Sequence, residues 1–235
     1  SEAVFGRQFV KYWIHNGFVD INNEKMSKSL GNFTMIKEVL GRYSPEVIRM
    51  FLLSNHYRSP IDYSEDSMRE VSLGLDRIYA FLERLESAGI KVEASKNGDL
   101  WIDFEKAMND DFNSAKAIAS VFEAVKKGNK LLDDTHDKPD AASLEILSLF
   151  YNDIKAISNI LGIFLLDPLS YFKAKKDRGM TDSTIDSDEI ENLIQQRAEA
   201  RKNKDFLKAD EIRDHLQNLN IILEDGPEGT TWRFE

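Results

Sequence analysis

The 235-residue chain contains no cysteine, and it has only five prolines and four histidines. Without cysteine, disulfides and thiolate metal sites are both excluded. No apolar run approaches the roughly 20 residues that a membrane-spanning helix needs. The opening residues also lack the pattern of a signal peptide. We therefore expect a cytoplasmic protein with no membrane partner.

Histidine is too scattered to suggest a metal centre. The four histidines show no ligand spacing; they are His15, His56, His136 and His215. A lone histidine is more often structural or solvated than a metal ligand. We expect no metal site within this chain.

The residues that are present are typical of a folded globular protein. The chain is 42% hydrophobic and 31% charged, and its length suits two or three small domains. The net charge of −10 argues against a generally basic nucleic-acid binder. Residues 1–60, however, carry eight Lys and Arg against five Asp and Glu, a net charge of +3, whereas the remainder carries 23 against 36, a net charge of −13. An RNA partner would have to meet local basic patches on an acidic body.

The first sixty residues predict short elements around a polar loop. The segment 9–14 is aromatic and β-branched, which predicts a strand, and 18–21 is a second candidate strand. A polar loop follows from 22 to 32. Ser44 then has the character of an N-cap, with Pro45 at the first position of a helix.

The middle of the chain predicts three long helices. Ser64 is a good cap for the first, whose apolar residues recur at the 3/4 spacing of one helical stripe: Met68, Val71, Leu75, Ile78, Leu82 and Leu85. Two further helices are predicted over about 114–132 and 142–161. Together the three favour an antiparallel helical bundle.

The last part of the chain predicts a small α/β domain. Residues 168–186 are rich in Pro, Lys, Asp, Ser and Thr, and we interpret them as an interdomain linker. Two shorter helices are predicted over about 187–202 and 206–219. The end of the chain, from 221 to 234, has the pattern of a β-hairpin. The predicted fold class is therefore mainly α.

One motif carries chemistry, the loop Lys25-Met26-Ser27-Lys28-Ser29. Two lysines three positions apart, interleaved with hydroxyls, can bring two ammonium groups onto one polyphosphate. Nucleotidyl transfer needs little more than such positioning and charge neutralisation. Judged on composition alone, a charged loop is more often a solvated surface.

The string KMSKS, however, is the signature of class I aminoacyl-tRNA synthetases. The chain resembles the cysteinyl-tRNA synthetases of that class over essentially its whole length. The matching strings, in order, are YWIHNG (12–17), EKMSKSLGNF (24–33), FLLS (51–54), HYRSP (56–60), MNDDFN (108–113) and LEDGPEGTTW (223–232).

The resemblance implies a fold with five regions. They are the end of a Rossmann-like catalytic domain with the KMSKS loop (1–33), a stem-contact region (34–66), the antiparallel helical bundle (67–167), the linker (168–186) and a small α/β anticodon-binding domain (187–235).

The resemblance also implies a reaction. Enzymes of the family activate cysteine with ATP and Mg to give cysteinyl-adenylate, and then transfer the cysteinyl group to the 3' end of cysteine tRNA. The matching loop assigns transition-state stabilisation first to Lys28 and then to Lys25. Ser27 and Ser29 would support ATP binding.

Further residues of the family pattern would contact tRNA. Positions used for the anticodon match Arg201, Phe206, Asp210 and Asp225, and Phe206 stands where the family can carry tryptophan. An aromatic ring stacks on an unpaired base, and carboxylates accept hydrogen bonds from base amino and imino groups; arginine pairs with a base edge. Arg58 is a weaker candidate, for a phosphate of the tRNA stem.

Part of the family pattern is missing from this chain. The second nucleotide-binding signature, HIGH, does not occur, and the zinc that grips the substrate thiol in this family has its ligands upstream of the chain. The resemblance is therefore to the C-terminal half of such an enzyme. We expect this segment to be inactive alone and monomeric.

Two other interpretations remain. A cysteine ligase that acts on an amino-sugar acceptor shares the lysine loop but has no use for an anticodon domain, so residues 187–235 argue against it. A non-catalytic tRNA-binding protein is the second alternative, although a pure binding module has no need of an intact KMSKS loop.

Overall fold

The computed structural model describes residues 2–22, 24–26, 33–92, 98–182, 185–219, 221–226 and 229–234. The chain divides into two compact units, Ser1–Leu165 and Leu166–Glu235.

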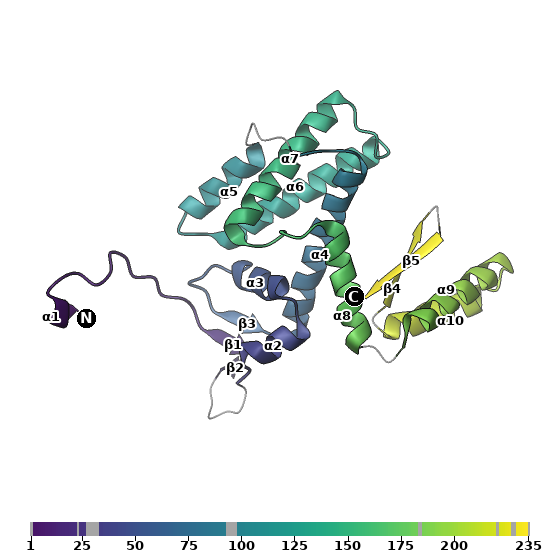
Figure 1. The fold of residues 1–235 in the computed structure, drawn as a ribbon, viewed down its shortest axis with the longest axis horizontal. Coiled ribbons are helices and arrows are strands. Elements are labelled where there is room, and N and C mark those ends of the chain that lie inside the picture. The colour runs from purple at the N-terminus through teal and green to yellow at the C-terminus, as the bar shows by residue number, and fades with distance from the viewer. Residues whose placement is uncertain are drawn as a thin grey trace. The chain divides into compact units, whose positions relative to one another are not determined.

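A small sheet lies near the start of the first unit. Strand β1 (Val19–Ile21) pairs antiparallel with β2 (Glu24–Lys25) and parallel with β3 (Ile61–Tyr63), as Figure 1 shows. Just before β1, the Gly17 amide donates to the Tyr57 carbonyl at 2.7 Å. A Cβ at Gly17 would collide with the backbone of Ser59, so only glycine allows this close approach.

The segment before the sheet differs from the expectation. Residues 9–14 were predicted to form a strand, but the structure shows none there, so that prediction is wrong. A strand is stable only when its backbone pairs with a neighbour. The ladders found in the described residues join β1 to β2 and β3, and β4 to β5, and none of them includes residues 9–14. The only regular element in this segment is the short helix α1 (Glu2–Phe5). Tyr12 and Trp13 are 85% and 71% exposed.

Two helices follow the loop. Helix α2 (Ile36–Arg42) is short, and α3 (Pro45–Leu53) begins as predicted, with Ser44 accepting a hydrogen bond from the Val47 amide at 3.2 Å. The fixed φ of Pro45 suits the first helical position. One face of α3 is buried in the first unit: Val47, Ile48, Met50 and Phe51.

The three predicted long helices are present as α4 (Glu65–Ser87), α6 (Ser114–Asp134) and α7 (Ala141–Leu161). Ser64 caps α4 by accepting from the Ser67 amide at 3.2 Å. The predicted stripe of α4 forms the core of the bundle, with five of its six residues fully buried. This confirms the 3/4 spacing as the core-facing side.

A fourth helix of the bundle, α5 (Asp99–Asn109), was missed. Its N-cap is Gly98, which has no side chain with which to cap it. Asp153 of α7 supplies the missing acceptor, because its carboxylate receives the amides of Gly98 and Trp101, each at 3.0 Å. Burial raises the pKa of Asp153, and these amide donors act in the opposite direction. The partner lies more than 50 residues away, so no local pattern could have revealed it.

The second unit combines helices with a hairpin. Helices α9 (Ser187–Lys202) and α10 (Phe206–Asn218) pack together beside the hairpin of β4 (Ile221–Gly226) and β5 (Gly229–Phe234). These elements match the prediction to within a residue or two at their ends. They enclose a core of their own, which consists of Ile185, Ile190, Ile194, Ile212, Leu216, Ile221, Trp232 and Phe234.

Most of the segment that we interpreted as a linker is helical. Helix α8 (Pro168–Asp182) packs against β5. The contact is tight, because a Cβ at Gly179 would collide with the ring of Phe234. The composition was misleading about local structure, since Lys and Ala favour helix and Pro168 suits the first turn. The role of the segment as a connection between domains stays a prediction.

The packing of α4 on α6 can be tested at Gly128. Gly128 on α6 is buried, and a Cβ there would collide with the ring of Phe81, which is itself fully buried. We expect Gly128→Ala to lower the free energy of unfolding by roughly 1–3 kcal/mol, the cost of overpacking a filled core. Urea unfolding followed by circular dichroism measures it.

Gly41→Ala is the matched control. Gly41 lies within α2, and nothing lies within 4 Å of its added Cβ. Its replacement should be neutral or stabilising by up to about 1 kcal/mol, the gain in helix propensity. Equal effects of the two substitutions would show that helix propensity, and not the contact with Phe81, sets the outcome at Gly128.

Candidate functional site

The sheet of the first unit holds the start of the lysine loop. Lys25 is the last residue of β2, and its backbone pairs with Asp20 of β1. Ser27, Lys28 and Ser29 lie outside the described residues. The roles of these four residues in binding ATP and in catalysis therefore stay predictions.

Arg58 lies in the loop between α3 and β3 and is engaged by a carboxylate. Its Nε donates to Asp111 Oδ2 at 2.6 Å and its Nη2 donates to Oδ1 at 3.1 Å. The Tyr57 hydroxyl also donates to Oδ1, at 2.7 Å, and the Arg58 guanidinium lies 5.2 Å from the centre of the Tyr57 ring. The contact ties the loop that carries HYRSP to the turn that carries MNDDFN.

The turn that carries Asp111 has an unusual backbone conformation. Asp111 and Phe112 have φ values of 55° and 53°, in the left-handed region that residues other than glycine rarely adopt. The hydrogen bonds from Arg58 and Tyr57 hold the pKa of Asp111 at about 2. Arg58 can therefore reach a phosphate only with N–H groups that Asp111 leaves open, or by leaving Asp111. Its contact with the tRNA stem stays a prediction.

A second cluster of charges lies in the second unit, where α9 meets the hairpin. Asp225 on β4 accepts from Arg197 Nη1 at 2.8 Å and from Nη2 at 3.0 Å, one donor on each carboxylate oxygen. Arg201 Nη1 donates to Oδ2 at 2.8 Å, and the Thr230 hydroxyl donates to Oδ1 at 2.7 Å. Two of the predicted anticodon residues, Arg201 and Asp225, are thus in direct contact.

The two arginines differ in burial. The Arg197 side chain is 10% exposed, whereas that of Arg201 is 52% exposed. The hydrogen bonds from Arg197, Thr230 and Arg201 hold the pKa of Asp225 well below its usual range, so the carboxylate is charged at any physiological pH. A pair that includes a buried guanidinium costs more to break than an exposed pair, which contributes only about 0–1 kcal/mol.

Arg197 was missed in the sequence. The available signal was its spacing: Arg197 and Arg201 are one helical turn apart on α9 and therefore share a face. Sequence alone does not show which of two such arginines is buried, because that depends on where the hairpin packs.

The other two predicted anticodon residues lie on α10. Phe206 is its first residue and is 61% exposed, free of the core of the unit. Asp210 lies 3.5 Å from Arg213 of the same helix. The pKa of Arg197 is raised mainly by its hydrogen bonds to Asp225 and, to a smaller extent, by the negative charge of Asp210. The structure therefore joins Arg201 to Asp225 by contact, whereas the ion pair of Asp210 is with Arg213. It leaves Phe206 available for stacking.

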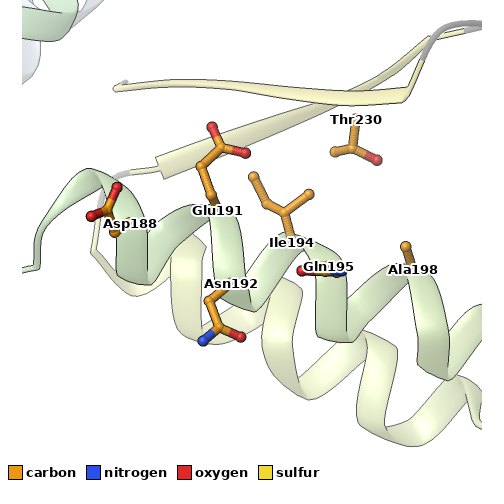
Figure 2. Close-up of a pocket in the computed structure, with 7 residues that line it drawn as sticks. All are labelled: Asp188, Glu191, Asn192, Ile194, Gln195, Ala198 and Thr230. Atoms are coloured by element: carbon orange, nitrogen blue, oxygen red, sulfur yellow. The ribbon is translucent and has the colours of Figure 1, made fainter.

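A groove of about 560 Å³ runs between α9 and the hairpin. Figure 2 shows Glu191 and Ile194 pointing from α9 toward the hairpin, with Thr230 on the opposite side. The groove is lined by carboxylate, amide, hydroxyl and small apolar side chains: Asp188, Glu191, Asn192, Ile194, Gln195, Ala198 and Thr230. Thr230 both lines the groove and donates to Asp225, so the groove adjoins the charge cluster.

Three family models match the chain in order. The model described as the tRNA synthetases class I (C) catalytic domain matches residues 1–73, the DALR domain matches 103–165, and the cysteinyl-tRNA ligase anticodon binding domain matches 187–233. The chain belongs to the cysteinyl-tRNA synthetase family. Its mainly helical fold, with a catalytic-domain segment, a helical part and an anticodon-domain segment, agrees with the fold class that the sequence predicted.

Individual relatives give the same result. The chain is 44% identical to a cysteine–tRNA ligase of Geotalea uraniireducens and 46% identical to that of Geotalea daltonii, over 99% of its length. It spans about half the length of these curated relatives, 51% in both cases. Among solved structures, a ternary LeuRS–tRNA–LeuAMS complex from Agrobacterium radiobacter covers 63% of the chain, and the chain covers 20% of it, at 23% identity and a TM-score of 0.45. This last likeness is too weak to carry an argument.

The residues that the structure describes hold no group of three or more His, Asp or Glu side chains that could bind a metal ion. No described helix is long and apolar enough to cross a membrane.

The two arginines of α9 allow a direct stability test. We expect Arg197→Ala to lower the free energy of unfolding of the second unit by roughly 2–3 kcal/mol. This is less than the ~3–5 kcal/mol for a fully buried pair, because Asp225 keeps contact with water. Arg201→Ala should cost at most about 1 kcal/mol. Urea unfolding of both variants measures the difference, and equal costs would contradict the assignment of Arg197 as the structural partner.

The Arg58–Asp111 contact predicts a titration. Because the folded pKa of Asp111 is about 2 and the unfolded value is about 3.9, its stabilising contribution is present above pH ~4 and is lost as the pH falls toward 2. The carboxyl group of Asp111 should remain ionised at pH 3, and the NMR chemical shift of its carboxyl carbon measures this. In Arg58→Ala the titration should move toward its ordinary range. A midpoint near 4 in the unsubstituted chain would show that the contact does not persist in solution.

Proposed function

We propose that this chain forms the KMSKS-loop and tRNA-binding part of a cysteine–tRNA ligase. The observation that carries the proposal is the order of the three matched regions around an intact KMSKS string at 25–29. The names of the relatives that match the whole chain support the same activity.

In the proposed reaction, a cysteine carboxylate oxygen attacks the α-phosphorus of ATP, and pyrophosphate leaves. A hydroxyl of the terminal ribose of cysteine tRNA then attacks the carbonyl of cysteinyl-adenylate, and AMP leaves. Lys28 and Lys25 would neutralise the phosphate charge that develops in the first step, with Ser27 and Ser29 as hydrogen-bond donors. Mg²⁺ would accompany ATP. The zinc of the family would be held by residues outside this chain.

The second unit would read the anticodon of cysteine tRNA. Arg201, Phe206, Asp210 and Asp225 are the residues that we propose for this role, and Arg58 would contact the tRNA stem. Support comes from the contact between Arg201 and Asp225 and from the exposure of Phe206, which suits a ring that stacks on a base. The complete protein would act in the cytoplasm as a monomer.

The rival functions fit less well. An amino-sugar ligase would not need the region 187–233, which matches an anticodon-binding domain. A non-catalytic tRNA-binding protein would not need the region 1–73, which matches a catalytic domain and includes KMSKS.

The decisive experiment uses the full-length protein that contains this chain. Lys28→Ala should lower the rate of cysteine-dependent ATP–pyrophosphate exchange by about 100-fold or more, the range for loss of a charge-stabilising donor. The KM for ATP should change much less, because the lysine acts mainly on the transition state.

Lys37→Ala is the control. Lys37 is an exposed lysine on α2, outside the motif, and its loss removes the same charge. Exchange activity should remain within about twofold of the unsubstituted protein. If Lys28→Ala left exchange unchanged, the catalytic assignment of the loop would fail, and an exchange reaction driven by another amino acid would refute cysteine as the substrate.

A further inference from the structure

We propose that Arg197 positions the Asp225 carboxylate for reading an unpaired RNA base, and that Arg201 is a displaceable donor which leaves Asp225 when RNA binds. This inference rests on the proposed anticodon-reading function. Within that function it assigns the base contact to Asp225 and limits Arg201 to a contact with the RNA backbone, a distinction between the two arginines that the sequence pattern does not show.

The argument begins with the number of donors on Asp225. A carboxylate offers about four lone-pair positions. In the structure, Asp225 receives four hydrogen bonds: two on Oδ1, from Arg197 and Thr230, and two on Oδ2, from Arg197 and Arg201. Its acceptor capacity is therefore full. A base N–H can bond to Asp225 only if one of these donors leaves.

The four bonds are not equally easy to give up. Arg197 makes two of them, and only 10% of its side chain is exposed. If it left, a buried cation would remain without its partner. Thr230 lies five residues from Asp225 across the turn of the hairpin, so the hairpin holds its hydroxyl in place. Arg201 makes a single bond, and half of its side chain faces solvent. It is the donor that can be exchanged at least cost.

The exchange leaves a defined acceptor. With Arg201 displaced, one lone pair of Oδ2 is open, while Arg197 and Thr230 hold the carboxylate in a fixed orientation. The open position suits an exocyclic amine or a ring N–H at the edge of an unpaired base. The groove that Thr230 also lines gives the neighbouring nucleotide a place beside it. Arg201 keeps its positive charge at the surface and moves to a backbone phosphate.

The two arginines then have different consequences for binding. Phosphate contacts position an RNA without reading it, whereas base contacts carry specificity. Loss of Arg201 should weaken binding to any sequence. Loss of the bidentate contact from Arg197 should weaken discrimination between anticodon sequences, because the orientation of the Asp225 carboxylate is no longer fixed.

The test uses the full 235-residue chain and two hairpin RNAs. One carries the anticodon stem and loop of a cysteine tRNA, and the other is identical except for an altered anticodon triplet. Dissociation constants are measured for both at several salt concentrations. The ratio of the two constants is the readout that a purely structural role would leave unchanged.

Arg197→Lys keeps the positive charge but loses the bidentate fork. We expect its discrimination ratio to fall at least tenfold, toward one, while binding of the altered hairpin stays within about twofold. Circular dichroism verifies that the variant is folded. Thr230→Val is a second variant that removes one donor without changing charge, and it should lower the ratio severalfold even if Arg197→Lys does not fold.

Arg201→Gln should give the opposite pattern. We expect both hairpins to bind more weakly, the ratio to stay within about threefold, and the slope of log K against log salt to fall by about one, the value for one lost phosphate contact. Lys126→Gln removes the same charge from an exposed site on α6 and should leave the ratio and the slope unchanged.

Other outcomes would overturn the inference. If folded Arg197→Lys discriminated between the hairpins as well as the unsubstituted chain, the orientation of the Asp225 carboxylate would be irrelevant. The same result in Thr230→Val would show this if Arg197→Lys does not fold. Loss of discrimination in Arg201→Gln would show that Arg201 itself reads the base. If the unsubstituted chain bound both hairpins equally or not at all, the anticodon-reading function would fail, and the inference with it.

Discussion

The second unit depends on one ion pair, between the buried guanidinium of Arg197 and the carboxylate of Asp225. This pair joins the helix α9 to the hairpin across two oxygens. A bidentate guanidinium–carboxylate contact fixes orientation as well as distance, so it orients the carboxylate to which Arg201 and Thr230 also donate. The surface proposed for reading RNA is therefore set by an interaction that lies mostly beneath it.

Carboxylates play a similar part in the first unit. Asp153 caps α5 from α7, and Asp111 receives Arg58 and Tyr57. Glu46 on α3 accepts from the Tyr79 hydroxyl at 2.9 Å and from the Phe164 amide, and burial raises its pKa. Each of these side chains joins segments that are distant in the sequence. A chain with 41 acidic residues thus uses a few of them as internal connectors and leaves most of them in solvent.

Sequence predicted best where the signal was local. Ser44 and Ser64 mark the starts of their helices, and the spacing of the α4 stripe marks its buried face. Prediction failed where the deciding partner was remote. Helix α5 has its capping group on α7, α8 takes its place against β5, and residues 9–14 have strand propensity without a strand beside them in the described part of the chain.

The candidate site divides in the same way. The KMSKS string and the anticodon positions came from resemblance to a family, and the structure added the contact between Arg201 and Asp225. Arg197 was absent from the prediction because its importance comes from burial by the hairpin, a property of the folded unit. Composition did not indicate the importance of Arg197, since the arginines of this unit are surrounded by many acidic residues.

The cap that Asp153 provides also bears on the order of folding. The backbone amides at the start of α5 find their acceptor only when α7 has packed into the bundle. During synthesis, α5 leaves the ribosome before residue 153 has been made. Its first turn must then remain hydrated until the later helix arrives, because no side chain of its own closes it. We therefore expect the helices of the bundle to form one cooperative folding unit only after α7, the last of its long helices, has packed.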